Sequence, residues 1–263
     1  MDYFVQSTDD LKIHYTQTNS KNTDVALVFV HGWLGHADWW LDQEEFFKQQ
    51  YNIVRIDLAG HGQSEHHRSE WTHTLYAQDI ASVIKQLNSK RVILIGHSMA
   101  GAYVLEALHF TDRVKAIVLI DTLKDLEQVF TFEQAEQTLF KQYKENYEFA
   151  VRNIIPQYLF TQETPKHVQV RLENEFLSYT AESAIALLAP LYKMDVQKAA
   201  KLVNVKVRAI NSDASPTHLK NNKKYFQDYD FKTITGTGHY PMLEKPDEFN
   251  HLLKEVVDKL LID

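Results

Sequence analysis

The chain has 263 residues, of which 44% are hydrophobic and 24% charged, so it is long enough for one sizeable core and too apolar to be disordered. Its net charge of −7 argues against a nucleic-acid partner, because binding to a phosphate backbone depends on clustered Lys and Arg. The sequence contains no cysteine, which excludes disulfides, thiolate nucleophiles and cysteine-based metal sites.

The amino-terminal stretch MDYFVQSTDDLKIHY is acidic and alternates polar with apolar residues, whereas a secretory signal is basic and then continuously apolar. No apolar run approaches the length that spans a membrane. The sequence therefore predicts a cytoplasmic protein with no membrane partner, and it gives no indication of the oligomeric state.

Strands and helices alternate through the first half of the chain. Alternating residues at 3–7 and 12–18 predict an antiparallel hairpin at the edge of a sheet. Runs rich in Val and Ile, typical of buried parallel strands, follow at 25–30, 51–56, 91–95 and 114–120. Segments with a helical spacing of apolar residues lie between them, at 74–87 and 99–110. This alternation predicts an open α/β sheet.

The pattern changes after Asp121, where no strand-like run occurs for about eighty residues. Apolar residues from Phe132 to Ile154 recur at three- and four-residue spacings, and 183–192 adds another helical segment. The chain closes with predicted strands at 205–210 and 231–236 and a helix at 246–261. We therefore predict an α/β core formed by residues 1–122 and 201–263, with a helical cap inserted at 123–200.

All eight glycines fall in four groups, each at the end of a predicted strand: Gly32 and Gly35, Gly60 and Gly62, Gly96 and Gly101, Gly236 and Gly238. Because glycine tolerates positive φ and close backbone approach, these groups predict tight turns along one edge of the sheet. Ligands bind at the carboxyl ends of the strands in such sheets. Strand ends also need turns for purely structural reasons, but the coincidence of all four favours a functional edge.

Ser98 lies in the segment GHSMAG (96–101), between a predicted strand and a predicted helix. This is the context expected of a G-x-S-x-G nucleophile elbow, with Ala100 in place of the second glycine. A helix N-cap is the alternative role for this serine, but a cap does not require small residues on both sides. A serine nucleophile needs a histidine base and an orienting carboxylate.

His239 is the best candidate for the base. It directly follows the last predicted strand, and the nearby Pro241 makes its loop irregular. Its loop lies on the same edge of the sheet as Ser98, and it comes last in the chain, as the order Ser, acid, His requires.

Four motifs follow one another along the chain: FVHGWLGH (29–36), RIDLAGHGQS (55–64), GHSMAG (96–101) and GTGHYPMLEKPDEF (236–249). They resemble the oxyanion loop, the turn after the fourth strand, the nucleophile elbow and the histidine loop of the α/β-hydrolase fold superfamily. The resemblance covers almost the entire chain. It implies a mostly parallel central sheet flanked by helices, an inserted helical lid and a Ser-His-Asp triad, and it leaves the substrate open.

Two aspartates are candidates for the triad acid. In most of the superfamily the acid follows the penultimate strand, where VKVRAINSDASPTH offers Asp213. The usual Gly-x-x-Asp spacing is absent there, and an ungapped alignment would put Ala214 or Ser215 at the acid position. Some members carry the acid after the preceding strand, where IVLIDTLKD offers Asp121. We favour Asp213, because its arrangement is the commoner one.

The resemblance assigns the oxyanion hole to the backbone N–H groups of Trp33 and Met99, and His31 is expected to brace the loop beside them. The histidines at 31, 36, 66 and 67 fit no compact set of metal ligands, so we expect no metal. The sequence has neither a glycine-rich phosphate loop nor a dinucleotide fingerprint, so we expect no cofactor.

Aromatic residues surround the predicted site: Trp33, Trp39 and Trp40 follow the oxyanion loop, and the inserted segment is rich in Phe and Tyr. We therefore expect a largely apolar pocket and a small-molecule substrate. The predicted function is a serine hydrolase that cleaves a carboxylic ester or related acyl bond through an acyl-enzyme. A lactonase, a thioesterase or a carbon–carbon bond hydrolase would use the same triad, and a ligand-binding receptor on a hydrolase scaffold is the alternative from another class.

Overall fold

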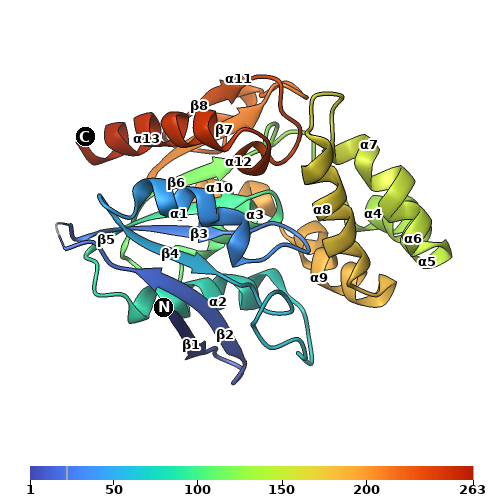
Figure 1. The fold of residues 1–263 in the computed structure, drawn as a ribbon, viewed down its shortest axis with the longest axis horizontal. Coiled ribbons are helices and arrows are strands. Elements are labelled where there is room, and N and C mark those ends of the chain that lie inside the picture. Colours follow the sequence, from blue (N-terminus) through green and yellow to red (C-terminus); the bar gives the residue numbers. More distant parts are fainter. Residues whose placement is uncertain (22, 263) are drawn as a thin grey trace.

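An eight-stranded sheet forms the centre of the computed structural model, which describes residues 1–21 and 23–262 (Figure 1). Its strands lie in the order β1-β2-β4-β3-β5-β6-β7-β8. Their bounds are β1 Asp2–Gln6, β2 Lys12–Thr18, β3 Val25–Val30, β4 Asn52–Ile56, β5 Arg91–His97, β6 Val114–Ile120, β7 Lys206–Ser212 and β8 Tyr229–Ile234. Every strand that the sequence predicts is therefore present.

The sheet is antiparallel only at one edge. β1 pairs with β2, and β2 with β4, in antiparallel register. From β4 across to β8 all neighbours are parallel. The carboxyl ends of six strands thus meet along one edge of the sheet, as the glycine pattern predicts.

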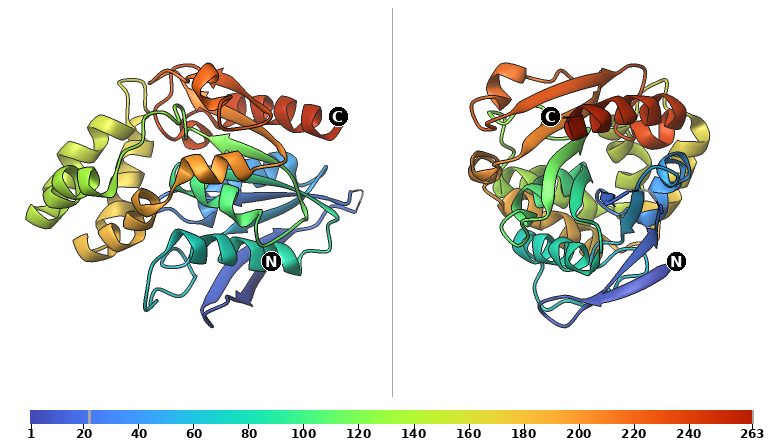
Figure 2. Two further views of the ribbon diagram at one scale, coloured as in Figure 1. Left: turned by 180° about the vertical axis from the view of Figure 1, so that it is seen from behind. Right: turned by 90° about the vertical axis from the view of Figure 1, so that its left-hand side faces the viewer.

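Helices cover both faces of the sheet, which is why all six residues of β3 are buried. The two views of Figure 2 show α1 (Leu41–Phe47) and α13 (Pro246–Ile262) on one face. The other face carries α2 (His73–Gln86), α3 (Met99–Ala107) and α10 (Val196–Leu202). Three short helices complete this part of the molecule: η1 Ala37–Trp40, α11 Leu219–Asn222 and α12 Pro241–Glu244.

The segment between β6 and β7 contains helices and no strand, as predicted. Its helices before α10 are α4 Phe132–Ala135, α5 Lys141–Glu145, α6 Tyr147–Phe149, α7 Ile155–Leu159, α8 Lys166–Leu177 and α9 Ala181–Lys193, with π-helical turns at η2 Glu136–Phe140 and η3 Ala150–Ile154. They gather beyond the carboxyl ends of the strands (Figure 1, right). The predicted boundary at residue 200 falls within α10, which contacts α3, and the division into core and cap stays a prediction.

Within the described residues, no helix has both the length and the hydropathy that a membrane crossing would require. The cytoplasmic location inferred from the sequence stays a prediction.

Candidate active site

Ser98 connects β5 directly to α3 through a strained turn. Its φ is 53° and its ψ is −123°, a conformation that side chains other than glycine rarely adopt. The flanking glycines allow this turn: a Cβ on Gly96 would lie 2.9 Å from the Ala100 carbonyl oxygen, and one on Gly101 only 2.3 Å from Thr122 Cγ2. The Ser98 side chain makes no capping hydrogen bond to α3, so the N-cap alternative does not describe it.

His239 lies opposite Ser98, with Nε2 at 2.7 Å from Ser98 Oγ. The backbone of His239 is tied on both sides. Its N–H donates to the Leu159 carbonyl at the end of α7 (2.8 Å), and its carbonyl accepts from His97 Nε2 (2.8 Å). The helical segment and the core strand β5 therefore fix the position of this histidine together.

A buried carboxylate organises the loop around His239. Glu244 in α12 is 7% exposed and accepts hydrogen bonds from the backbone N–H groups of Gly238 (2.7 Å) and Tyr240 (3.0 Å). The Thr164 hydroxyl, from the loop before α8, also donates to it at 2.8 Å. These bonds satisfy backbone donors on both sides of His239, so the irregular loop predicted around Pro241 is rigidly held.

Asp121, at the end of β6, is the acid that contacts His239. Its Oδ2 lies 2.7 Å from His239 Nδ1, and its Oδ1 accepts from the Ser212 backbone N–H and from Lys124 Nζ, each at 2.7 Å. Burial acts to raise the pKa of Asp121, but the hydrogen bond from His239 and the charge of Lys124 outweigh it and hold that pKa below its ordinary value. An ionised Asp121 keeps the proton of His239 on Nδ1, so Nε2 presents its lone pair to Ser98.

The sequence favours Asp213 over Asp121 as the acid, but in the structure Asp121 contacts His239 and Asp213 does not. Asp213 is exposed, and its Oδ1 accepts from the Gly236 backbone N–H at 3.0 Å, which bridges the turns after β7 and β8. Asp121 reaches His239 instead because its φ of 45° turns the chain abruptly as β6 ends. The missing Gly-x-x-Asp spacing at 205–218 was the sequence signal for this difference.

The predicted oxyanion loop packs directly against the elbow. A Cβ on Gly32 would lie 2.9 Å from Ser98 Cβ, so only glycine permits this approach. Among the described residues, no acceptor binds the backbone N–H of Trp33. The N–H of Met99 belongs to the first turn of α3, where backbone donors lack a partner within the helix. Both predicted donors are thus available beside Ser98.

His31 joins two of the loops on this edge. Its Nδ1 donates to the Gly32 carbonyl (2.7 Å), and its Nε2 accepts from the Leu58 backbone N–H (3.0 Å). Burial lowers the pKa of His31 to about 4, so the ring is neutral and can hold both bonds. His36 pairs with Glu175 on α8. In the part of the chain that the structure describes, no group of three or more His, Cys, Asp or Glu residues is placed to hold a metal.

A cavity of about 490 Å³ opens beside Ser98 and His239. No Asp, Glu, Lys or Arg is found among the described residues that form its walls. The lining residues, drawn from the core and the helical segment, are Trp33, His97, Ser98, Phe130, Thr138, Leu139, Tyr143, Ile154, Ile155, Tyr158, Leu159, Leu188, Leu191, Tyr192, His239 and Tyr240. The expected apolar pocket is therefore present, although Trp39 and Trp40 are buried in the core and do not line it.

Sequence reasoning missed the residues that support the contacts among Ser98, His239 and Asp121. Lys124 and Glu244 each have one weak signal: a cation three residues after Asp121, and a carboxylate within a loop otherwise rich in apolar residues. His97 is part of the elbow motif, and the sequence gives no signal of its supporting role. Burial lowers the pKa of His97 to about 3, so its ring is neutral. None of these roles can be assigned without knowing which loops meet.

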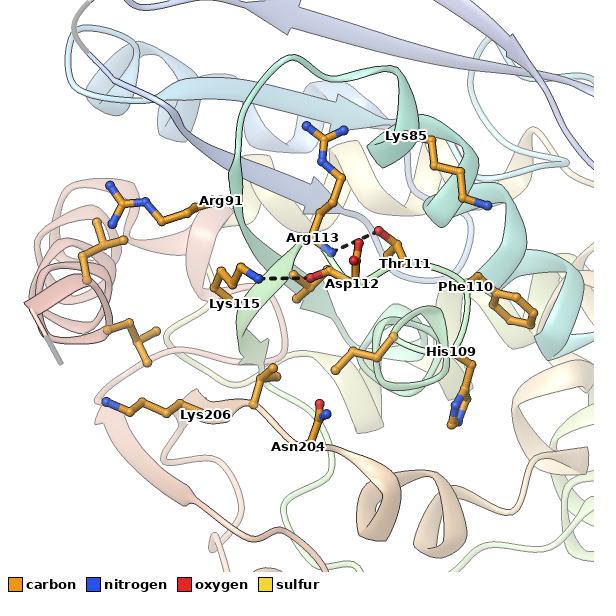
Figure 3. A pocket seen from close by; sticks show the side chains of 15 residues that line it. Lys85, Arg91, His109, Phe110, Thr111, Asp112, Arg113, Lys115, Asn204 and Lys206 are labelled. Atoms are coloured by element: carbon orange, nitrogen blue, oxygen red, sulfur yellow. Dashed lines mark hydrogen bonds between the residues drawn. The ribbon is translucent and has the colours of Figure 1, made fainter.

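A second cavity, of about 920 Å³, lies at the opposite edge of the sheet (Figure 3). Among the described residues, its walls include five cations, Lys85, Arg91, Arg113, Lys115 and Lys206, and a single carboxylate, Asp112. It shares no lining residue with the cavity beside Ser98. The two ends of the sheet thus differ sharply in chemistry.

A model of the alpha/beta hydrolase family matches residues 27–252. A candidate esterase/lipase of Haemophilus influenzae is 28% identical over 265 residues, which cover 95% of this chain and 88% of that protein. Protein ABHD8 of Homo sapiens is 33% identical over 116 residues, or 43% of this chain and 26% of that protein. An esterase from Exiguobacterium antarcticum has the same fold, with a TM-score of 0.83, 20% identity, and coverage of 98% of this chain and 100% of its own. The chain therefore belongs to the alpha/beta hydrolase family and is an enzyme with the mostly parallel sheet and flanking helices that its sequence predicts.

Proposed function

We propose that the protein is a serine hydrolase that cleaves a carboxylic ester of a small, largely apolar substrate. One observation carries the proposal: two hydrogen bonds of 2.7 Å link Ser98 through His239 to Asp121 at the wall of an apolar cavity. A chain of nucleophile, base and orienting carboxylate is the arrangement that activates a serine hydroxyl.

The first half-reaction forms an acyl-enzyme. Ser98 Oγ attacks the carbonyl carbon of the ester while its proton passes to His239 Nε2. Asp121 stabilises the resulting imidazolium through the hydrogen bond at Nδ1 and does not itself take the proton. His239 then gives the proton to the departing alkoxide, so the alcohol leaves and Ser98 remains acylated.

The second half-reaction releases the acid. Water gives a proton to His239 Nε2 and attacks the acyl carbonyl, and His239 returns the proton to Ser98 Oγ as the carboxylic acid leaves. In both half-reactions negative charge develops on the carbonyl oxygen. The N–H groups of Trp33 and Met99 are proposed to bind it, and removing one such donor typically costs about a hundredfold or more in rate.

Helices α4 to α9 are proposed to act as the cap. They supply most of the apolar cavity wall, including Leu139, Tyr143 and Leu188. The Trp33 indole N–H donates to the Ala184 carbonyl on α9 (2.8 Å), and Trp33 stacks on Tyr143 with ring centroids 5.7 Å apart. An uncharged wall favours a neutral acyl group over an anionic one, because a buried charge without a partner is costly.

The experiment is the hydrolysis of p-nitrophenyl acetate, butyrate and octanoate by the wild type and by Ser98→Ala, with labelling by a serine-directed fluorophosphonate. We expect Ser98→Ala to lose roughly a thousandfold or more in kcat/KM and all labelling. Ser178→Ala, which removes a serine on the exposed end of α8, serves as the matched control and should retain both.

Each other outcome has a distinct meaning. Labelling without steady ester turnover would favour a lactone, thioester or carbon–carbon bond as the substrate, or a receptor that is acylated once. Turnover that persists in Ser98→Ala would contradict the assignment of the nucleophile.

A further inference from the structure

Lys124 is bound to the triad acid from the side opposite His239. Its Nζ lies 2.7 Å from Asp121 Oδ1 and donates to the Ser212 carbonyl (3.2 Å), the Ser212 hydroxyl (3.1 Å) and the Ser215 hydroxyl (3.1 Å). Its side chain is only 14% exposed. One ammonium group thus connects the acid at the end of β6 with the loop that follows β7.

The backbone around Lys124 explains why such a connection is needed. Asp121 has a φ of 45° and Leu123 a φ of 49°, and such strained conformations persist only where the surrounding structure enforces them. The Lys124 carbonyl accepts from the His218 N–H at 2.7 Å, which adds a second bond to the loop after β7. The strained turn is therefore held through Lys124 and also through Asn222 of α11, whose side-chain amide donates to the Leu123 carbonyl at 2.8 Å.

The buried carboxylate of Asp121 is a second reason for the contact with Lys124. It is 5% exposed, and its Oδ1 faces away from His239. A buried carboxylate oxygen needs donors, and a buried negative charge needs a compensating cation. The Ser212 N–H supplies one donor and no net charge, so the compensating cation at this oxygen is Lys124.

We propose that Lys124 is a positioning residue of the triad, which holds the Asp121 carboxylate at the end of β6 and balances its charge. The inference rests on the proposed function for its kinetic consequence and not for its geometry. Lys124 is not among the residues that line the cavity beside Ser98, although it lines an adjacent cavity of about 370 Å³. Its contact with Asp121 Oδ1 is the route by which we expect it to act.

Other ionisable groups near His239 and Asp121 differ from Lys124 in position or charge. His97, on β5, is neutral because burial lowers its pKa to about 3. Glu244, on α12, bonds to the backbone on either side of His239, and Asp213 bonds to Gly236. Lys245 is directed to the Thr235 carbonyl. Among these groups, only Lys124 contacts the Asp121 carboxylate with a positive charge.

The test is the pH dependence of kcat/KM for p-nitrophenyl butyrate in Lys124→Met. Without the ammonium, the full charge of Asp121 acts on His239 and favours its imidazolium, which cannot serve as the base. We expect the acidic limb of the profile to move to higher pH by roughly one pH unit. We also expect kcat on the plateau to fall about tenfold with KM nearly unchanged, because uniform substrate binding is not affected. Lys220→Met, on the exposed surface of α11, is the matched control and should reproduce the wild type.

A double-mutant cycle with Asp121→Asn separates positioning from a general structural role. If Lys124 acts through Asp121, Lys124→Met should add little to the loss already caused by Asp121→Asn. Losses that simply multiply, with an unchanged acidic limb, would overturn the proposal. Thermal unfolding checks that the variants fold. If Lys124→Met does not fold, the same measurements are made with Lys124→Gln.

A measurement without substrate keeps this inference distinct from the proposed function. The His239 ring proton, identified by its loss in His239→Asn, can be titrated by NMR in the wild type and in Lys124→Met. We expect the imidazolium to persist to higher pH in the variant. An identical titration would refute the role of Lys124 even in an active esterase, whereas a shifted titration in a protein without esterase turnover would contradict only the proposed function.

Discussion

The two edges of the sheet differ in the charge of their cavities and in the conformation of their loops. At the carboxyl edge, Ser98, His239 and Asp121 meet an uncharged cavity, whereas at the amino edge five cations surround a larger one. Backbone strain is also unevenly distributed. The described residues with positive φ that are not glycine and that follow β3, β5 and β6 all lie at the carboxyl edge: Leu34, Ser98, Asp121 and Leu123.

The amino edge uses its charges to join chain segments. The Arg113 guanidinium donates to the carbonyls of Ile84 and Ser89, which connects β6 to the end of α2. Arg91 pairs with Asp24 at 3.0 Å. Such bonds join loops, and the described residues at this edge have no positive φ. At the carboxyl edge, by contrast, the strained residues Ser98 and Asp121 place their side chains on either side of His239. The comparison indicates that backbone strain, more than cavity size or charge, distinguishes the edge that carries the proposed active site.

The largest effect is expected from replacing the carboxylate that contacts His239, compared with replacing the other aspartate on this edge. We expect Asp121→Asn to lower kcat/KM by roughly a thousandfold or more, because an amide favours the wrong tautomer of His239. Asp213→Asn should change kcat/KM by less than about threefold, since it removes only a bond to the Gly236 backbone. Steady-state hydrolysis of p-nitrophenyl butyrate measures both. A large loss in Asp213→Asn alone would restore Asp213 as the acid.

Filling the apolar cavity should have a smaller and selective effect. Leu139, in η2, lines the cavity, so Leu139→Trp should reduce its volume. We expect the ratio of kcat/KM for octanoate over acetate to fall about tenfold, as pocket contacts worth one or two methylenes would predict. Val170→Trp, at an exposed position on α8, is the control. Equal losses for both esters would mean that the cavity does not hold the acyl group.

The smallest effect is expected at the amino edge. The double variant with Lys85→Gln and Lys115→Gln removes two cations from the cavity of Figure 3. Because exposed charges contribute little and this edge lies across the sheet from Ser98, kcat/KM should stay within about twofold of the wild type. A tenfold loss, with an unchanged unfolding temperature, would show that the two edges are coupled.

The sequence alone determines the elements and most of the site. Val and Ile runs specify buried strands, because side chains covered on both faces must be apolar. The small residues around Ser98 predict the elbow, because only they tolerate a turn that sharp. The buried strands and the elbow each depend on residues that are neighbours in the chain, so both can be predicted from one sequence.

Only the tertiary structure decides which aspartate contacts His239. Asp121 and Asp213 follow adjacent parallel strands, so their backbones end at the same edge, and strand order cannot separate them. The choice depends on φ at Asp121, on the bond from Asp213 to Gly236 and on the ammonium of Lys124. These are contacts between loops far apart in the chain. Local sequence patterns encode the strands that bring such loops together, but the direction of each side chain is set by the packing of the loops against one another.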